Sequence, residues 1–99
     1  MSGLSSQQRI ILRWLLYHTR LVEQADPRWL EGGIAWVPQS VPKTNEAFEN
    51  VWRASLCRSL ARLENRGLIT RIKGRKKART LRVLLTPEGR KVVESLPLY

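Results

Sequence analysis

The sequence predicts a mainly α-helical fold that carries a small antiparallel β-hairpin. Two long stretches, residues 5–24 and 44–66, repeat their apolar residues at intervals of about 3.6, the period of an amphipathic helix. Two short stretches, residues 68–73 and 80–86, alternate as strands do and are separated by a basic loop. A chain of 99 residues buries one small core, so we expect a single domain over residues 1–99.

The first helix has sequence signals at both of its ends. Ser5 as the N-cap and Gln8 three residues later form a capping-box pattern. Asp26 and Pro27 then end the helix behind Gln24, because proline cannot continue it.

Aromatic residues along this helix and in the loop that follows it have two interpretations. Trp14, Tyr17 and Leu21 fall on or beside the apolar face, where they either pack in the core or form the contact of a homodimer through the N-terminal helix. Trp29 and Trp36 lie in the loop over residues 25–43, and we expect them to pack over the core as lids, with stacking on a ligand as the alternative. Within this loop, residues 34–37 predict a short strand that the prolines at 38 and 42 prevent from extending.

Residues 44–66 carry a second helical stripe, which consists of Phe48, Trp52, Leu56, Leu60 and Leu63. One long helix fits this spacing, and so do two helices joined by a tight turn near residues 50–54. Gly67 predicts the end of the helical segment, since glycine is favoured directly after a helix.

The last part of the chain predicts a hairpin followed by a short helix. The two strands enclose a tip that begins at Gly74 and continues into consecutive cations. Thr86 as N-cap, Pro87 at the first helical position and Glu88 in the first turn then start the final helix. The predicted order of helix, short strand, helix, helix, hairpin and helix is that of a winged helix-turn-helix.

The net charge of +10 is confined to one segment of the chain. Residues 53–82 contain eleven Lys and Arg against Glu64 alone, a balance of 11 − 1 = +10, whereas the other residues carry seven basic and seven acidic groups. Such a concentration of cations indicates an anionic partner, most often nucleic acid, with an anionic membrane surface as the lesser alternative.

Several classes of protein are disfavoured by the composition. The single cysteine, Cys57, and the single histidine, His18, provide neither an intramolecular disulfide nor a set of metal ligands, and no cofactor is expected. Cys57 is expected to be a small packed residue at the margin of the leucine face, with a redox switch as the alternative. No second carboxylate or histidine accompanies Glu64 for acid–base work, so we expect no enzyme and no catalytic residue. The chain has neither a secretory signal nor the ~18 apolar residues of a membrane span, so we expect a cytoplasmic protein.

The second helix presents a polar face opposite its leucines. At about 100° per residue, Arg58, Arg62 and Asn65 project away from Leu56, with Ser55 at the edge and Arg53 at the helix entrance. We expect residues 54–66 to be a recognition helix in the major groove, where arginine can bind guanine and asparagine can bind adenine. Arg53 and Ser55 are candidates for phosphate contacts.

The predicted wing, residues 73–79, supplies a second cluster of cations. Its members are Lys73, Arg75, Lys76, Lys77 and Arg79. Flexible cations suit phosphates or a minor groove better than fixed hydrogen bonds to bases. Glu64 is expected to pair with Arg62, Arg66 or Arg71 and to hold the helix against the wing.

Two sequence runs in the second half of the chain resemble those of the MarR-type winged-helix transcriptional regulators. Residues 63–68, LENRGL, resemble the run that ends the recognition helix in that family, and residues 85–89, LTPEG, resemble the run that ends the wing. The resemblance covers residues 53–96, whereas residues 25–52 depart from the family's compact second helix. It implies a winged helix-turn-helix that binds double-stranded DNA and regulates transcription.

Two other functions also fit the sequence. The same basic surface suits a winged-helix module that serves DNA replication or partition, or that binds structured RNA by its shape. Alternatively, the tryptophans at 14, 29, 36 and 52 form an exposed patch for a protein partner, an interpretation that leaves the concentrated charge unexplained.

Overall fold

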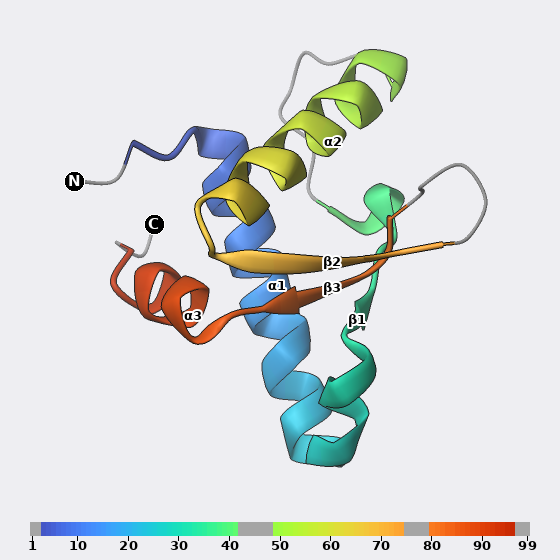
Figure 1. The fold of residues 1–99 in the computed structure, drawn as a ribbon, viewed down its shortest axis with the longest axis vertical. Coiled ribbons are helices and arrows are strands. Elements are labelled where there is room, and N and C mark those ends of the chain that lie inside the picture. The colour runs from blue at the N-terminus through green and yellow to red at the C-terminus, as the bar shows by residue number, and fades with distance from the viewer. Residues whose placement is uncertain (1–2, 42–48, 75–79, 97–99) are drawn as a thin grey trace.

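The computed structural model describes residues 3–41, 49–74 and 80–96, with residues 49–52 described through their backbone alone. The chain forms three α-helices and three strands: α1 (Ser6–Ala25), β1 (Ile34–Ala35), α2 (Glu49–Asn65), β2 (Ile69–Lys73), β3 (Thr80–Leu85) and α3 (Pro87–Glu94) (Figure 1). Two short 3-10 helices, η1 (Pro27–Gly32) and η2 (Pro38–Ser40), flank β1. The prediction of a mainly helical fold with a small antiparallel sheet is confirmed.

Helix α1 begins and ends where its sequence signals predict. The Ser5 hydroxyl accepts a hydrogen bond from the Gln8 backbone N–H at 3.1 Å, and the Gln8 side chain accepts one from the Ser5 N–H at 3.0 Å. Together these bonds form the predicted capping box. At the other end, the Asp26 N–H donates to the Val22 carbonyl at 2.8 Å, and the chain turns into η1 at Pro27.

Helix α2 is continuous from Glu49, so the alternative with a turn at residues 50–54 is wrong. Any helix within residues 44–48 lies outside the described part of the chain. The C-terminus of α2 is a Schellman motif, in which the Leu68 N–H donates to the Leu63 carbonyl at 3.0 Å and the Gly67 N–H donates to the Glu64 carbonyl at 2.9 Å. Gly67 has a φ of 75°, which explains why glycine follows this helix.

The sheet contains the predicted hairpin and one additional strand. Its order is β1-β3-β2, with both pairs antiparallel. The short strand expected at residues 34–37 is observed as β1, which pairs Ile34 with Val83. Ile34, Val83 and Ile69 are buried on the inner face of the sheet.

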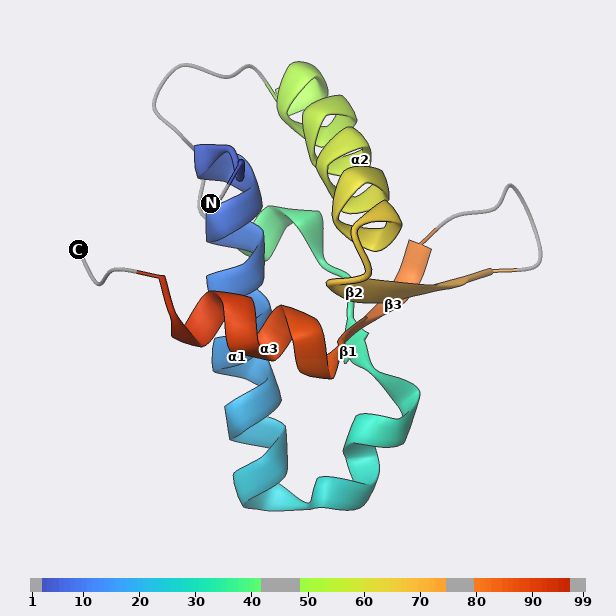
Figure 2. The same ribbon diagram turned by 60° about the vertical axis from the view of Figure 1, so that its left-hand side comes forward.

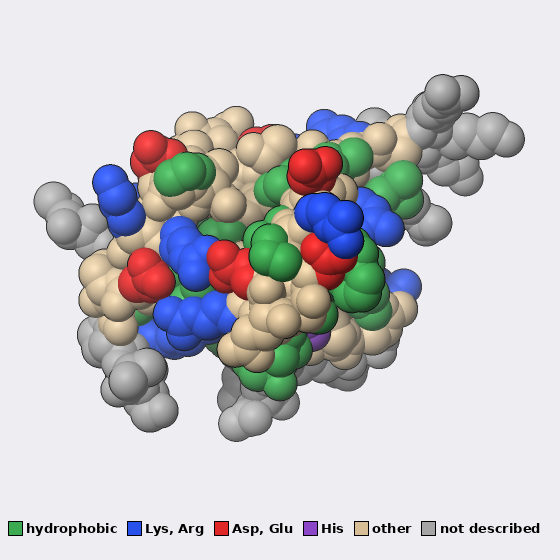
Figure 3. Space-filling view, turned by 90° about the horizontal axis from the view of Figure 1, so that it is seen from below, with side chains coloured by type: hydrophobic (Ala, Val, Ile, Leu, Met, Phe, Trp, Pro, Cys, Tyr) green, Lys and Arg blue, Asp and Glu red, His purple; other side chains and the backbone are tan. Residues whose placement is uncertain are grey.

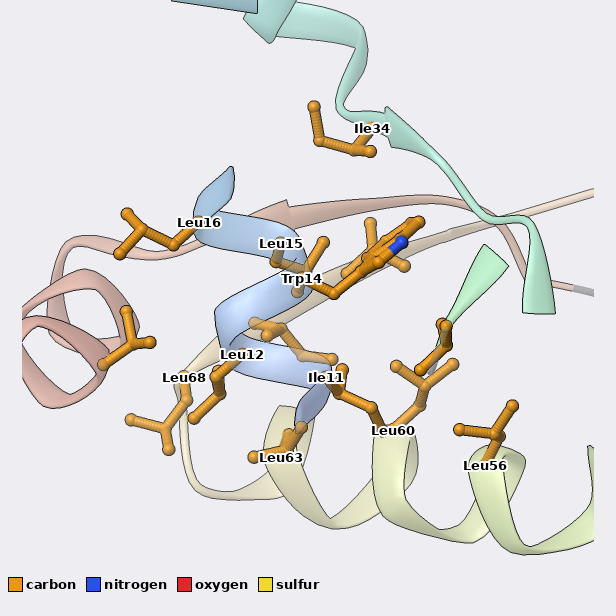
Figure 4. Close-up of a cluster of buried hydrophobic side chains, with 14 of the residues drawn as sticks. Ile11, Leu12, Trp14, Leu15, Leu16, Ile34, Leu56, Leu60, Leu63 and Leu68 are labelled. Atoms are coloured by element: carbon orange, nitrogen blue, oxygen red, sulfur yellow. The ribbon is translucent and has the colours of Figure 1, made fainter. Parts of the chain in front are cut away.

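Helix α1 passes through the centre of the molecule and contacts α2, α3 and the sheet (Figures 1 and 2). The leucine face of α2 packs toward α1, as Figure 4 shows for the side chains between these helices. Leu56, Leu60 and Leu63 are at most 1% exposed, which confirms the predicted buried face of α2 as far as its side chains are described. Its burial determines which residues of α2 face outward.

Aromatic residues of the N-terminal half divide between the core and the surface. Trp14 is buried and lies edge-on to the half-buried Trp36, with ring centroids 5.6 Å apart. Tyr17 and Leu21 are 62% and 44% exposed, so the stripe along α1 extends beyond the core. Trp29 is 63% exposed, and its predicted role as a lid is wrong because Leu30 packs against the core from η1 instead.

Cys57 also differs from its prediction. It is exposed on α2 and not packed at the margin of the leucine face. The reason is that the leucine face of α2 meets α1 over a narrow stripe centred on Leu60, which leaves Cys57 beyond its edge.

Candidate nucleic-acid interface

The outward face of α2 carries the predicted recognition residues. Arg53, Arg58, Arg62 and Asn65 are all exposed. Within the described part of the chain, neither Arg58 nor Arg62 forms an ion pair or a side-chain hydrogen bond. The two guanidinium groups are therefore available to an external acceptor.

Ser55 lies on a different side of α2 from these arginines. Its hydroxyl donates to the Gln7 side-chain oxygen of α1 at 2.9 Å, and the Ser59 hydroxyl donates to the same oxygen. Ser55 and Ser59 are four residues apart and therefore lie one above the other along the helix. This placement gives Ser55 a role in joining α2 to α1, whereas the sequence had suggested a phosphate contact.

Glu64 joins α2 to the hairpin through Arg71. One carboxylate oxygen accepts from the Arg71 backbone N–H at 2.9 Å, and the other lies 3.0 Å from Arg71 Nε and 2.9 Å from its Nη2. The backbone hydrogen bond from Arg71, together with the guanidinium beside it, lowers the pKa of the Glu64 carboxyl. Arg71 is thus a partner of Glu64, as one of the sequence alternatives predicted, while Arg66 donates to the Gly3 carbonyl at 3.3 Å.

The base of the hairpin is described, and most of its predicted cationic tip is not. Lys73 is exposed at the end of β2, whereas Arg75, Lys76, Lys77 and Arg79 lie outside the described residues. Arg82, which was not among the predicted site residues, is exposed on β3, and its Nη1 donates to the Gly33 carbonyl at 3.2 Å. The sequence did contain a signal for this position: neighbouring residues of a strand point to opposite faces, so Arg82 lies on the outer face because Val83 is buried.

The two sequence runs that resemble the MarR-type regulators are in direct contact. The Thr86 hydroxyl donates to the Gly67 carbonyl at 2.7 Å and accepts from the Gly89 N–H at 3.0 Å. The Thr86 N–H donates to the Leu68 carbonyl at 3.1 Å. A Cβ on Gly89 would lie 1.9 Å from the Leu68 carbonyl oxygen, so only glycine permits this approach. The contact holds the end of α2 against the start of α3.

The opposite end of the molecule has a different arrangement of charges. Figure 3 shows acidic and basic side chains interspersed on this end. Arg20 lies 3.3 Å from Glu94, Arg28 lies 2.9 Å from Asp26, and Arg90 lies 3.0 Å from Glu23. Hydrogen bonding from Arg90 lowers the pKa of Glu23, and hydrogen bonding from Arg28 lowers the pKa of Asp26.

A groove of about 660 Å³ lies between α1 and α3 at this end. Leu16, Leu21, Val93 and Leu96 provide its apolar lining, and Tyr17 contributes an exposed ring. Arg13, Arg20 and Glu94 also line the groove, so both signs of charge border its apolar part.

Metal sites and membrane spans are absent from the described residues. These residues contain no group of three or more potential ligands that could hold a metal ion. None of the described helices is long and apolar enough to cross a lipid bilayer. Comparison with protein-family models, curated proteins and solved structures found no match for this chain.

Proposed function

We propose that this protein is a winged helix-turn-helix that binds double-stranded DNA sequence-specifically and regulates transcription in the cytoplasm. The observation that carries the proposal is the pair Arg58 and Arg62, exposed without ion pairs among the described residues on the same helix as Asn65. Arginine can bind guanine through two hydrogen bonds in the major groove, and asparagine can bind adenine in the same way. An α-helix of 17 residues with such a face suits that groove.

The hairpin supports the same proposal through its charge. It extends from the end of α2, and its segment from residue 73 to residue 79 contains five cations. If four or five of them neutralise phosphates, the logarithm of the binding constant falls with the logarithm of salt concentration with a slope of about −4 from the wing alone. These contacts provide affinity, whereas the face of α2 provides the specificity.

Binding to labelled duplexes tests the proposal directly. Fluorescence anisotropy with a random duplex at moderate salt is expected to show salt-dependent binding, and selection from a random duplex library is expected to enrich one sequence. Absence of binding, or binding independent of salt, contradicts the proposal. Binding without enrichment supports a module for replication or partition, and preference for RNA of the same sequence supports recognition of structured RNA.

The protein-interaction alternative has less support among the described residues. Trp14 is buried and Trp36 is half-buried, so neither is fully available to an exposed patch, and Trp29 alone of these three is exposed. The side chain of Trp52 lies outside the described residues. Iodide quenching of several tryptophans without nucleic-acid binding would favour this alternative.

We propose in addition that a second copy of the chain is a partner, through the groove between α1 and α3. The exposed apolar lining of this groove can be covered by the same face of a second copy in a two-fold dimer. Sedimentation equilibrium is expected to show a dimer that Leu21→Glu dissociates; a wild-type monomer contradicts this assembly.

A further inference from the structure

Glu64 is the only carboxylate within the basic segment of residues 53–82. A negative charge at this place opposes the approach of a polyanion, because it repels phosphate and cancels one cation. Glu64 is therefore unsuited to contacting DNA itself, and its three contacts with Arg71 indicate a structural role.

The contact lies where the hairpin leaves the core. Along β2, Ile69 is 2% exposed, the Arg71 side chain is 15% exposed and Ile72 is 37% exposed. The pairing of β2 with β3 becomes irregular immediately afterwards, between Ile72 and Lys73. Arg71 is thus the last residue of β2 whose side chain is largely buried.

The two edges of the hairpin are held by different elements. On the β3 side, β1 pairs with β3, and the residues on either side of β1 add two bonds: the Trp36 N–H donates to the Leu81 carbonyl at 2.9 Å, and Arg82 donates to the Gly33 carbonyl. On the β2 side, the Glu64 carboxylate accepts a hydrogen bond from the Arg71 backbone N–H, which would otherwise be an unpaired donor on the edge of the sheet. Glu64 thus links the C-terminal turn of α2 to the outer edge of the hairpin.

We propose that Glu64 is a positioning residue that sets the angle between α2 and the hairpin, so that both meet the same DNA duplex. This inference rests on the proposed DNA-binding function. Arg71 acts with Glu64 as the second half of the joint and does not itself contact DNA. One carboxylate oxygen contacts the guanidinium of Arg71 and the other accepts from its backbone N–H, and two such contacts fix an orientation better than one does.

Distance measurements between two spin labels test the joint without DNA. Cys57 is the only cysteine and is exposed on α2, and Thr80→Cys places a second label at the start of β3. Pulsed electron paramagnetic resonance is expected to give a narrow distance distribution, which Glu64→Gln broadens or shifts. Glu31→Gln, an exposed glutamate in η1, is the matched control and leaves the distribution unchanged. Identical distributions in all three proteins overturn the proposal.

Binding to the selected duplex provides a second test, because charge and position predict opposite results. Glu64→Gln removes a negative charge, so electrostatics alone predicts tighter binding. If the substitution also displaces the hairpin relative to α2, binding is expected to weaken by about tenfold. The magnitude of the salt slope is then expected to fall by about 2, because the wing neutralises roughly two fewer phosphates. Glu31→Gln makes the same change in net charge and is expected to bind as tightly as the wild type or slightly more so. Tighter binding of Glu64→Gln overturns the proposal.

Arg71→Lys is a second variant that keeps the charge and removes the paired geometry. It is expected to change the label distances and the salt slope in the same direction as Glu64→Gln, with thermal unfolding recorded for each variant to establish that it is folded. If the wild type binds no duplex, the proposed function fails, while the label distances still decide whether Glu64 positions the hairpin.

Discussion

The two ends of this molecule differ in how their exposed arginines are engaged, apart from the Arg71–Glu64 pair at the base of the hairpin. At the end formed by the far part of α1, η1 and α3, Arg20, Arg28 and Arg90 each lie within 3.3 Å of a carboxylate. At the end formed by α2 and the hairpin, Arg58 and Arg62 are exposed without such a partner among the described residues. Paired arginines complete the protein's own surface, whereas clustered unpaired ones leave their charge for another molecule to neutralise.

The distribution of charge also affects the stability of the folded state. Cations gathered in one segment repel each other and destabilise the folded state, a cost that interspersed charges avoid. The phosphates that a duplex presents along a helix and a wing would remove this repulsion. Charge balance therefore supports α2 and the hairpin as the proposed DNA-facing surface, independently of any sequence run.

The largest expected effect comes from breaking the contact that joins the two ends. Gly89→Ala places a Cβ 1.9 Å from the Leu68 carbonyl oxygen, so α3 must move away from the end of α2. We expect a loss of about 4 kcal/mol in the free energy of unfolding, or a fall in Tm of roughly 15–30 °C for a domain of this size. Thermal unfolding followed by circular dichroism measures it.

Gly67→Ala is the matched control for this substitution. No atom lies within 4 Å of its Cβ position, and only the φ of 75° opposes a side chain. The expected cost is about 1 kcal/mol. Equal changes in Tm for the two variants would show that the close approach at Gly89 does not hold the two ends together.

The next largest effect is on DNA affinity, and it compares the arginines of α2 with those of the opposite end. Arg58→Ala and Arg62→Ala are each expected to weaken binding to the selected duplex by ~1–3 kcal/mol, because each removes a hydrogen-bonding group from a base edge. Arg20→Ala and Arg28→Ala remove the same charge from the paired end and are expected to change the affinity less than about twofold at moderate salt. Anisotropy titrations of all four variants measure this, and equal losses would abolish the distinction between the two ends.

The tip of the wing is expected to affect the salt dependence of binding and not its sequence specificity. Alanine at residues 75–77 is expected to weaken all duplex sequences alike, since these cations serve phosphates or the minor groove. The magnitude of the salt slope should fall by about 2.7, at ~0.9 for each phosphate that is no longer neutralised. A change in sequence preference without a change in slope would contradict this assignment.

The smallest effect concerns the paired end and acid. The pKa of Glu23 is lowered by its hydrogen bonds from Arg90, so the pair stabilises the folded state above the unfolded pKa of about 4.3 and this contribution is lost as the pH falls through the lowered pKa. Glu23→Gln should therefore lower Tm at pH 7, and the difference should vanish as the pH falls through the lowered pKa of Glu23. A difference that persists in acid would show that the carboxylate's charge is not the cause.

Local structure was the part of the fold that could be predicted best. The capping box at Ser5, the helix stop at Gly67 and the N-cap at Thr86 were all recognised from a few neighbouring residues. Each depends on hydrogen bonds between residues three to five positions apart, so the information is contained in a short stretch of chain.

The candidate site was predicted less completely. The outward direction of Arg58, Arg62 and Asn65 followed from helical periodicity, because burial of the leucines determines the opposite face. The engagement of Ser55 with Gln7 was missed, since the two residues are 48 positions apart and nothing in their local sequence indicates the contact. The exposure of Trp29 and Cys57 was missed for a related reason, as the extent of a buried face depends on what packs against it.

The sequence by itself determined most of the helices and strands, the face of α2 that is buried and the segment that carries the charge, because these follow from local propensities, periodicity and composition. Tertiary structure decided which charges meet. It brought Arg71 to Glu64 and Arg90 to Glu23 as ion pairs. It also brought the backbone of Gly89 to that of Leu68, and such contacts require the chain to fold back on itself. The division between paired and unpaired arginines, on which the proposed function rests, exists only once those distant residues are side by side.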